Sequence, residues 1–92
     1  MIFEWDRHKT ASNRTKHGIS FMEAATVFRD PLGRITDDPR HSDAEQRYVI
    51  LGHSRAMRLV TVMFTERGEA IRIISARRAT RQERRDYEEG KS

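Results

Sequence analysis

The sequence contains no cysteine, only two prolines and five glycines, and no hydrophobic run long enough to cross a lipid bilayer. The absence of cysteine excludes a disulfide framework, a thiolate metal site and a thiol nucleophile, and it fits a reducing cytoplasm, where we expect the chain to act. We expect no signal peptide, because charged residues follow Met1 within a few positions. The sequence therefore predicts a protein without a membrane segment.

Lysine is also scarce. The three lysines, Lys9, Lys16 and Lys91, leave 15 arginines among the 18 basic residues, against 14 acidic ones, for a net charge of +4. Residues 47–92 carry 11 of the basic and 6 of the acidic side chains. Arginine presents a planar fork of donors that matches phosphate oxygens, so the bias favours an anionic partner, with nucleic acid the first to consider.

The length and composition suit one small domain. A chain of 92 residues that is 36% hydrophobic and 35% charged can bury one modest core. No internal repeat or low-complexity segment divides the sequence. We therefore expect a single domain over residues 1–92.

The N-terminal third predicts a strand followed by two helices. Residues 2–5 form a short strand pattern, and Asp6 can cap a helix that ends near Gly18. Ser20-Phe21-Met22-Glu23 is a capping box for a second helix, which Asp30-Pro31 ends. The two helices and their glycine turn predict a helical hairpin.

The rest of the chain predicts strands and one last helix. After an acidic, turn-rich stretch, alternating apolar residues predict an antiparallel meander. The predicted strands lie near residues 34–36, 47–52, 58–66 and 70–77. Thr80 and Glu83 form a second capping box for a helix that reaches about Glu89. The order β-α-α-β-β-β-β-α indicates an α+β fold.

The sequence also suggests how the two strands of the last hairpin, near residues 58–66 and 70–77, pair with each other. A turn at Arg67-Gly68 brings apolar residues together on one side of the sheet. It gives two apolar pairs, Phe64 with Ile71 and Val62 with Ile73. The same register sets Arg58 opposite Arg77, and like charges in that position cost stability unless an anion lies between them. This predicts a phosphate site at the end of the hairpin.

Several segments along nearly the whole chain point to one protein family. They are Phe3-Glu4-Trp5-Asp6, Lys16-His17-Gly18-Ile19-Ser20-Phe21, His41-Ser42, residues 47–52, and Ile71-Arg72-Ile73-Ile74-Ser75-Ala76-Arg77-Arg78-Ala79-Thr80. In this order and at this chain length, the sequence resembles the BrnT toxin family. The combination of the Lys-His-Gly segment with the distal Ile-Ser-Ala-Arg-Arg-Ala-Thr segment is more specific than either segment alone.

The resemblance implies a fold, an activity and partners. The fold is RelE-like, a twisted antiparallel sheet with a helical hairpin on one face and a C-terminal helix. The activity is that of a type II toxin that cleaves RNA and arrests growth. The partners are a BrnA-like antitoxin with a ribbon-helix-helix domain, the RNA substrate, and operator DNA bound through the toxin-antitoxin complex, which represses its own operon.

Two other functions fit the same residues. A non-catalytic module could use the arginines to bind nucleic acid or an acidic antitoxin segment. A toxin on the RelE/ParE scaffold could have another target, such as gyrase, because a fold alone does not determine function.

RNA cleavage without a metal ion needs a base for the 2′-OH proton, cations for the charge on phosphorus, and an acid for the leaving 5′-oxygen. We expect a metal-independent endoribonuclease with no cofactor. The candidate catalytic residues are Arg77, His17, Arg58 and Tyr87. The candidate RNA or phosphate ligands are Arg78, Lys16, Arg72 and Arg81.

Each catalytic candidate also has a structural explanation. Arg77 could pair with an acid of the last helix such as Glu83, and Arg58 could be an exposed residue at a strand end. His17 lies in the last turn of a helix, where a positive charge complements the helix dipole. Tyr87 is the one aromatic residue of a polar helix and could anchor it to the sheet.

The remaining histidines do not form a recognisable metal motif. His41 and His53 follow Asp37 and Asp38 at a spacing that matches no strong ligand pattern. We therefore predict no metal site.

Overall fold

The computed structural model describes residues 1–38 and 45–90, which form a five-stranded sheet, three α-helices and one 3₁₀ helix. The elements are β1 (Ile2–Glu4), α1 (Arg7–His17), α2 (Phe21–Thr26), the 3₁₀ helix η1 (Val27–Arg29), β2 (Arg34–Asp37), β3 (Arg47–His53), β4 (Leu59–Arg67), β5 (Ala70–Arg78) and α3 (Arg81–Glu89). The predicted α+β order is confirmed. Within residues 1–38 and 45–90, every helix is too short or too polar to span a lipid bilayer.

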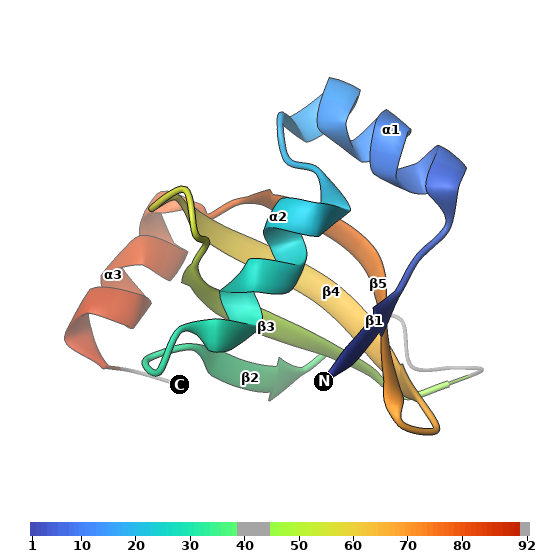
Figure 1. Ribbon diagram of the computed structural model, residues 1–92. Coiled ribbons are helices and arrows are strands. Elements are labelled where there is room, and N and C mark those ends of the chain that lie inside the picture. The colour runs from blue at the N-terminus through green and yellow to red at the C-terminus, as the bar shows by residue number, and fades with distance from the viewer. Residues whose placement is uncertain (39–44, 91–92) are drawn as a thin grey trace.

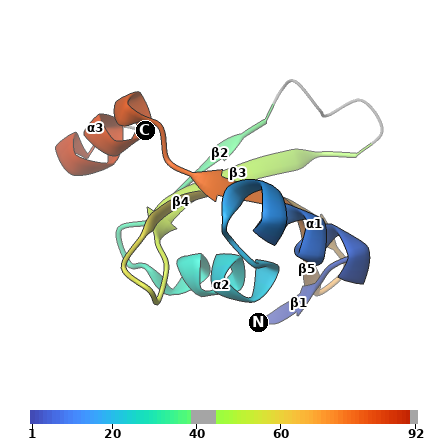
Figure 2. The same ribbon diagram turned by 90° about the horizontal axis from the view of Figure 1, so that it is seen from above.

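The sheet has the strand order β1-β5-β4-β3-β2. Strands β2 to β5 pair antiparallel, as predicted, whereas β1 pairs with β5 in parallel. Figures 1 and 2 show α1 and α2 on one face of the sheet and α3 at one end, away from them. The opposite face is left free of α1 and α2, and it is called the helix-free face below.

The helix ends follow the capping signals of the sequence. The Asp6 side chain accepts hydrogen bonds from the first free amides of α1, and Gly18 ends this helix at a φ of 73°. The Ser20 hydroxyl accepts from the Glu23 amide at 3.1 Å. The Glu23 carboxylate, however, does not return to Ser20, because it binds Arg58. The predicted capping box of α2 is therefore half formed.

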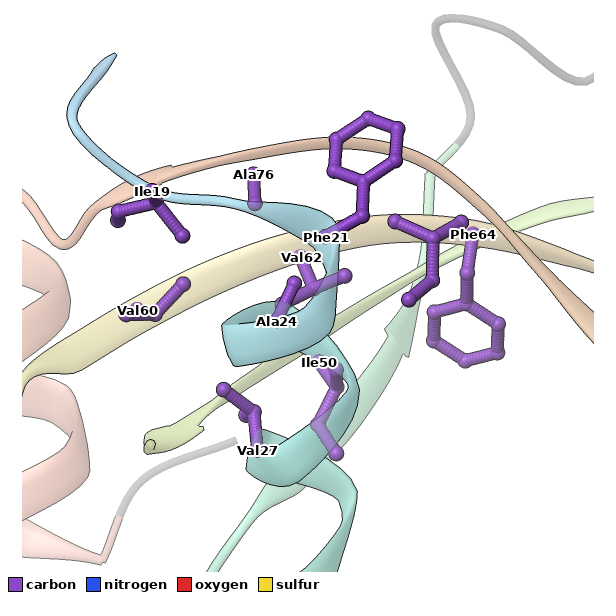
Figure 3. Close-up of a cluster of buried hydrophobic side chains, with 10 residues drawn as sticks. Ile19, Phe21, Ala24, Val27, Ile50, Val60, Val62, Phe64 and Ala76 are labelled. Carbon is purple, nitrogen blue, oxygen red and sulfur yellow. The ribbon is translucent and has the colours of Figure 1, made fainter. Parts of the chain in front are cut away.

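The core lies between the sheet and the segment that runs from Ile19 through α2 and η1 (Figure 3). Its buried members are Ile19, Phe21, Ala24, Val27, Ile50, Val60, Val62, Phe64, Ile73 and Ala76. Burial of one large apolar side chain contributes about 1.5–3 kcal/mol. The buried Asn13 amide of α1 donates to the carbonyls of Ile19 and Ala76 at 2.8 Å each, and its oxygen accepts from the Ala76 amide at 3.2 Å. This side chain joins α1 directly to β5.

The β4–β5 turn differs from the predicted one. The turn is at Gly68-Glu69, where Gly68 has a φ of 59°, and Arg67 pairs with Ala70. The turn is thus one residue later than predicted, which shifts the cross-strand pairs of Phe64 to Arg67 by two positions. Phe64 consequently pairs with Ile73. The predicted pairs were wrong, but a shift of two keeps these side chains on their predicted apolar face.

A β-bulge changes the end of the same hairpin. The register shifts between Met63 and Phe64, so that Ile74 is an extra residue on β5. After the bulge Arg77 pairs with Thr61, and Arg58 lies before β4 begins. The predicted opposition of Arg58 and Arg77 is therefore wrong. Arg77 lies on the helix-free face with Thr61, because one added residue reverses which face each following side chain takes.

Candidate functional site

The end of the sheet next to α3 is the place where β3 and β5 finish and β4 begins. His53 pairs with Leu59 there, and Val60 pairs with Arg78. Three groups of paired polar side chains lie at this α3 end, and they come from segments far apart in the chain. They are named below by one member each, as the Arg58, Arg77 and Asp30 groups.

The Arg58 group joins the turn after α1, helix α2 and the loop between β3 and β4. The Arg58 side chain donates through Nε to Glu23 Oε2 at 2.9 Å, through Nη2 to Glu23 Oε1, and through Nη2 to the Gly18 carbonyl at 3.0 Å. The Ser54 hydroxyl donates to the same carboxylate at 2.7 Å. The hydrogen bond from Arg58, together with the one from Ser54, lowers the pKa of Glu23. The Arg58 guanidinium is thus already hydrogen-bonded to groups of the protein.

The Arg77 group joins α3 to the sheet. The Arg77 guanidinium donates to the two oxygens of Glu83 at 2.7 and 3.0 Å. Glu83 also accepts from the Thr61 hydroxyl at 3.0 Å and from the Thr80 amide at 2.8 Å. Burial favours a higher pKa for Glu83, but these hydrogen bonds outweigh it and lower the pKa to about 2. The structural explanation considered for Arg77, an ion pair with Glu83, is confirmed.

A hollow of about 460 Å³ lies beside the Arg77 group on the helix-free face. Its lining comprises Thr36, Asp38, Arg47, Val49, Thr61, Met63, Ile74, Ser75, Arg77 and Glu83. The apolar members come from the strands, and the charged ones include two arginines and two carboxylates. The volume and mixed lining are typical of a site for a small ligand or a single nucleotide.

The Asp30 group connects the loop after η1, the end of β3 and the middle of α3. The Tyr87 hydroxyl donates to Asp30 Oδ2 at 2.7 Å, and the His53 amide donates to the same oxygen at 2.7 Å. His53 Nδ1 lies 3.1 Å from the Tyr87 hydroxyl, and the two rings meet edge to face. Burial and the hydrogen bond to Asp30 raise the pKa of Tyr87 to about 12. The prediction that Tyr87 anchors α3 is confirmed.

Glycine at position 52 makes this arrangement possible. A Cβ atom at Gly52 would lie 3.1 Å from Asp30 Oδ2 and 3.2 Å from Val27 Cγ1. A side chain there would push Asp30 away from His53. Burial favours a higher pKa for Asp30, but the hydrogen bonds from His53, Tyr87 and the Leu32 amide together lower it.

The other sequence-predicted residues lie in three places. Arg78 and Arg81 are exposed at the α3 end, beside the Arg77 group. Lys16 and His17 are exposed in the last turn of α1. Arg72 pairs with Glu4 of β1 at 3.5 Å, away from the α3 end. The structure thus brings together Arg58, Arg77, Arg78, Arg81 and Tyr87 at one end of the sheet, but not Arg72.

His53 and Asp30 were not among the predicted catalytic or RNA-binding residues. Asp30, His53 and Tyr87 are separated by 23 and 34 residues, so no periodic pattern links them. The signal that was available is Gly52, since a glycine inside a strand pattern marks a close approach of other atoms. The described residues contain no group of His, Cys, Asp and Glu that could hold a metal ion, and His41 lies outside them.

Comparisons with known proteins identify the family. The chain matches a family model described as the ribonuclease toxin BrnT of type II toxin-antitoxin systems over residues 5–83. It is similar to the crystal structure of the Brucella abortus ribonuclease toxin BrnT, with 25% sequence identity and a TM-score of 0.63, over 88% of this chain and 100% of that one. The comparison with curated proteins gives no match. Because the family match covers most of the chain, this protein belongs to the BrnT family of ribonuclease toxins of type II toxin-antitoxin systems.

Proposed function

We propose that this chain is an endoribonuclease that cleaves RNA without a metal ion and binds its substrate at the α3 end of the sheet. The observation that carries the proposal is the family match over residues 5–83, which includes most of this end. RNA supplies its own nucleophile, the 2′-OH, so that cleavage requires proton transfer and stabilisation of charge on phosphorus. Arginines and a proton acceptor can provide both.

Exposed arginines supply the binding surface. Arg78 ends β5, and α3 presents Arg81, Arg84 and Arg85. Within the described ranges none of these four forms an ion pair. Arg77 retains N–H groups that are not used by Glu83, because a guanidinium has five. We assign phosphate contacts to Arg77, Arg78 and Arg81.

The remaining parts of the proposal concern partners. Membership of a type II system implies an antitoxin that inhibits this toxin. We propose a BrnA-like antitoxin with a ribbon-helix-helix domain, through which the complex binds operator DNA and represses its own operon in the cytoplasm. The net charge of +4 suits both an RNA substrate and an acidic antitoxin segment.

The test is cleavage of a defined RNA by the purified chain in EDTA, without ribosomes. We expect cleavage that excess antitoxin abolishes. The double variant Arg78→Ala and Arg81→Ala should raise KM with little change in kcat, because it removes phosphate contacts made in ground and transition states alike. Arg67→Ala is the matched control, since this exposed arginine lies at the opposite end of the sheet.

Each alternative function gives a different result. If only ribosome-bound mRNA is cleaved, the chain is a ribonuclease that needs the ribosome for activity. RNA binding without cleavage in either assay would indicate a binding module, and inhibition of DNA supercoiling would indicate gyrase. Cleavage that requires added magnesium would contradict the metal-independent mechanism.

A further inference from the structure

A second cavity lies at the α3 end, next to the exposed side of His53. It has a volume of about 600 Å³ and is lined by Thr26, Arg29, Asp30, His53, Ser54, Arg55 and Met57. Arg29 and Arg55 are exposed, and neither forms an ion pair within the described parts of the chain. A pocket with two available guanidinium groups beside an imidazole suits a phosphodiester.

The Asp30 group fixes how the His53 ring is protonated. The Tyr87 hydroxyl has a single proton, which it donates to Asp30 Oδ2. The hydroxyl oxygen can therefore only accept at His53 Nδ1, 3.1 Å away. A neutral His53 thus carries its proton on Nδ1 and leaves Nε2 as an acceptor. The His53 side chain is 33% exposed, whereas that of Asp30 is 8% exposed, so the orienting carboxylate is buried and the ring is accessible.

We propose that His53 is the general base of this ribonuclease and that the scissile phosphodiester binds in the cavity between Arg29 and Arg55. The inference rests on the proposed ribonuclease function and adds the site of the chemistry. Tyr87 and Asp30 are positioning residues that hold the imidazole in the basic form at Nε2. The arginines of α3 bind neighbouring nucleotides of the same RNA strand.

The proposed step is a transesterification. His53 Nε2 takes the proton of the 2′-OH while the 2′-oxygen forms a bond to phosphorus. The bond from phosphorus to the 5′-oxygen breaks, and the leaving oxygen takes a proton from water. The imidazolium then returns its proton to the solvent. The products are a 2′,3′-cyclic phosphate and a 5′-hydroxyl, and no oxidant, reductant or metal takes part.

Other proton acceptors fit less well. The Tyr87 pKa of about 12 keeps the hydroxyl protonated at neutral pH. Glu83, with a pKa of about 2, is a weak base whose oxygens already accept four hydrogen bonds. His17 is exposed at the end of α1 and has no hydrogen bond that fixes its ring among the described contacts. Among the described residues, the titratable or charged groups that contact His53 or line its cavity are Asp30, Tyr87, Arg29 and Arg55.

The test compares three histidine variants in single-turnover cleavage of a defined RNA. His53→Gln should reduce the rate about 100-fold or more, as expected for loss of a general base, and should leave the affinity for an RNA with a 2′-deoxy substitution at the cleavage site unchanged. His8→Gln is the matched control on the exposed first turn of α1. His17→Gln tests the competing histidine. Thermal unfolding of each variant establishes that it is folded.

The outcomes separate this inference from the proposed function. Cleavage by the parent chain with an unchanged rate in His53→Gln would overturn the inference alone. A large rate loss in His17→Gln but not in His53→Gln would move the base to His17. If the parent chain cleaves neither free nor ribosome-bound RNA, the proposed function and the inference both fail. Product ends other than a 2′,3′-cyclic phosphate also contradict the inference.

A second measurement determines which nitrogen of the His53 imidazole carries the proton. Nitrogen NMR of the full chain should show the proton of neutral His53 on Nδ1, and Tyr87→Phe should move it to Nε2. Tyr87→Phe should also reduce the cleavage rate without weakening RNA binding. A parent imidazole already protonated on Nε2 would refute the role given to Tyr87 and Asp30.

Discussion

At the scale of single residues, arginines at the α3 end divide into two classes. Arg58 and Arg77 donate to Glu23 and Glu83, so that much of each guanidinium serves to join segments of the chain. Arg78 and Arg81 are exposed and form no ion pair within the described ranges. A carboxylate within reach makes an arginine part of the fold, as at Arg58 and Arg77, and leaves it fewer N–H groups for phosphate than an exposed arginine has.

The Glu83 carboxylate should make stability depend on pH. Its folded pKa of about 2 lies below the ordinary value of 4.5, so its contribution is complete above pH 4.5 and is lost as the pH falls toward 2. That contribution is on the order of 2 kcal/mol after allowance for solvent screening. We expect Glu83→Gln to be less stable than the parent chain at pH 7 and to lose less stability on acidification, as measured by urea unfolding.

Glu88→Gln provides the control for this prediction. Glu88 is an exposed carboxylate on the same helix, and its removal should leave the acid dependence of stability unchanged. Parallel pH profiles for the parent chain and Glu83→Gln would show that the ion pair with Arg77 does not stabilise the folded state.

At the scale of elements, α3 depends on two contacts one helical turn apart. Glu83 joins it to Arg77 and Thr61, and Tyr87 joins it to Asp30. None of the residues of this helix is buried, so these polar contacts replace an apolar stripe. The second contact requires Gly52, whose missing side chain leaves room for Asp30.

Gly52→Ala should therefore weaken the attachment of α3 to the rest of the protein, although Gly52 itself lies in β3. The added methyl would meet Asp30 and Val27 at 3.1 and 3.2 Å, and we expect a loss of about 1–3 kcal/mol in the free energy of unfolding. Amide exchange in α3 should become faster, because Asp30 no longer holds Tyr87. Hydrogen exchange measured residue by residue checks this expectation.

Gly68→Ala is a suitable comparison. Gly68 has a φ of 59° with open space around it, so alanine costs about 1 kcal/mol through backbone strain at the opposite end of the sheet. This variant should leave exchange in α3 as it is in the parent chain. Equal acceleration in both variants would mean that α3 responds to overall stability and not to Asp30.

At the scale of the whole molecule, charge is concentrated at one end of the sheet. The net charge of +4 is modest, yet β5 and α3 together place four exposed arginines at the α3 end, where two cavities are lined by further arginines. We expect such an arrangement to bind a polyanion with a strong dependence on salt, because each phosphate contact releases bound counterions.

The salt dependence of RNA binding should report these contacts. Replacement of Arg81, Arg84 and Arg85 by glutamine should reduce the slope of log K against log salt by about 2, at roughly 0.7 for each phosphate contact with single-stranded RNA. The measurement uses an RNA that the protein cannot cleave. Arg67→Gln, at the far hairpin turn, should leave the slope unchanged. An unchanged slope in the triple variant would place the RNA elsewhere.

Local sequence signals were enough to predict the order of the helices and strands and most of their ends. Capping residues such as Asp6 and Thr80 and glycines such as Gly18 and Gly90 act on their own neighbours, so local rules located them correctly. The family segments lie within the same local stretches. Local physical chemistry and family resemblance together were sufficient for the fold class and the broad activity.

Which side chains meet depends on how the strands pair and the helices pack, and local signals do not contain this information. One bulge at Ile74 placed Arg77 on the helix-free face beside Thr61, and a turn one residue later than predicted separated it from Arg58. Asp30, His53 and Tyr87 come from a loop, a strand and a helix, and they meet because β3 ends where α3 packs. A register shift of two residues keeps apolar side chains on their face, and a bulge reverses the face of every residue after it; both change which polar side chains meet.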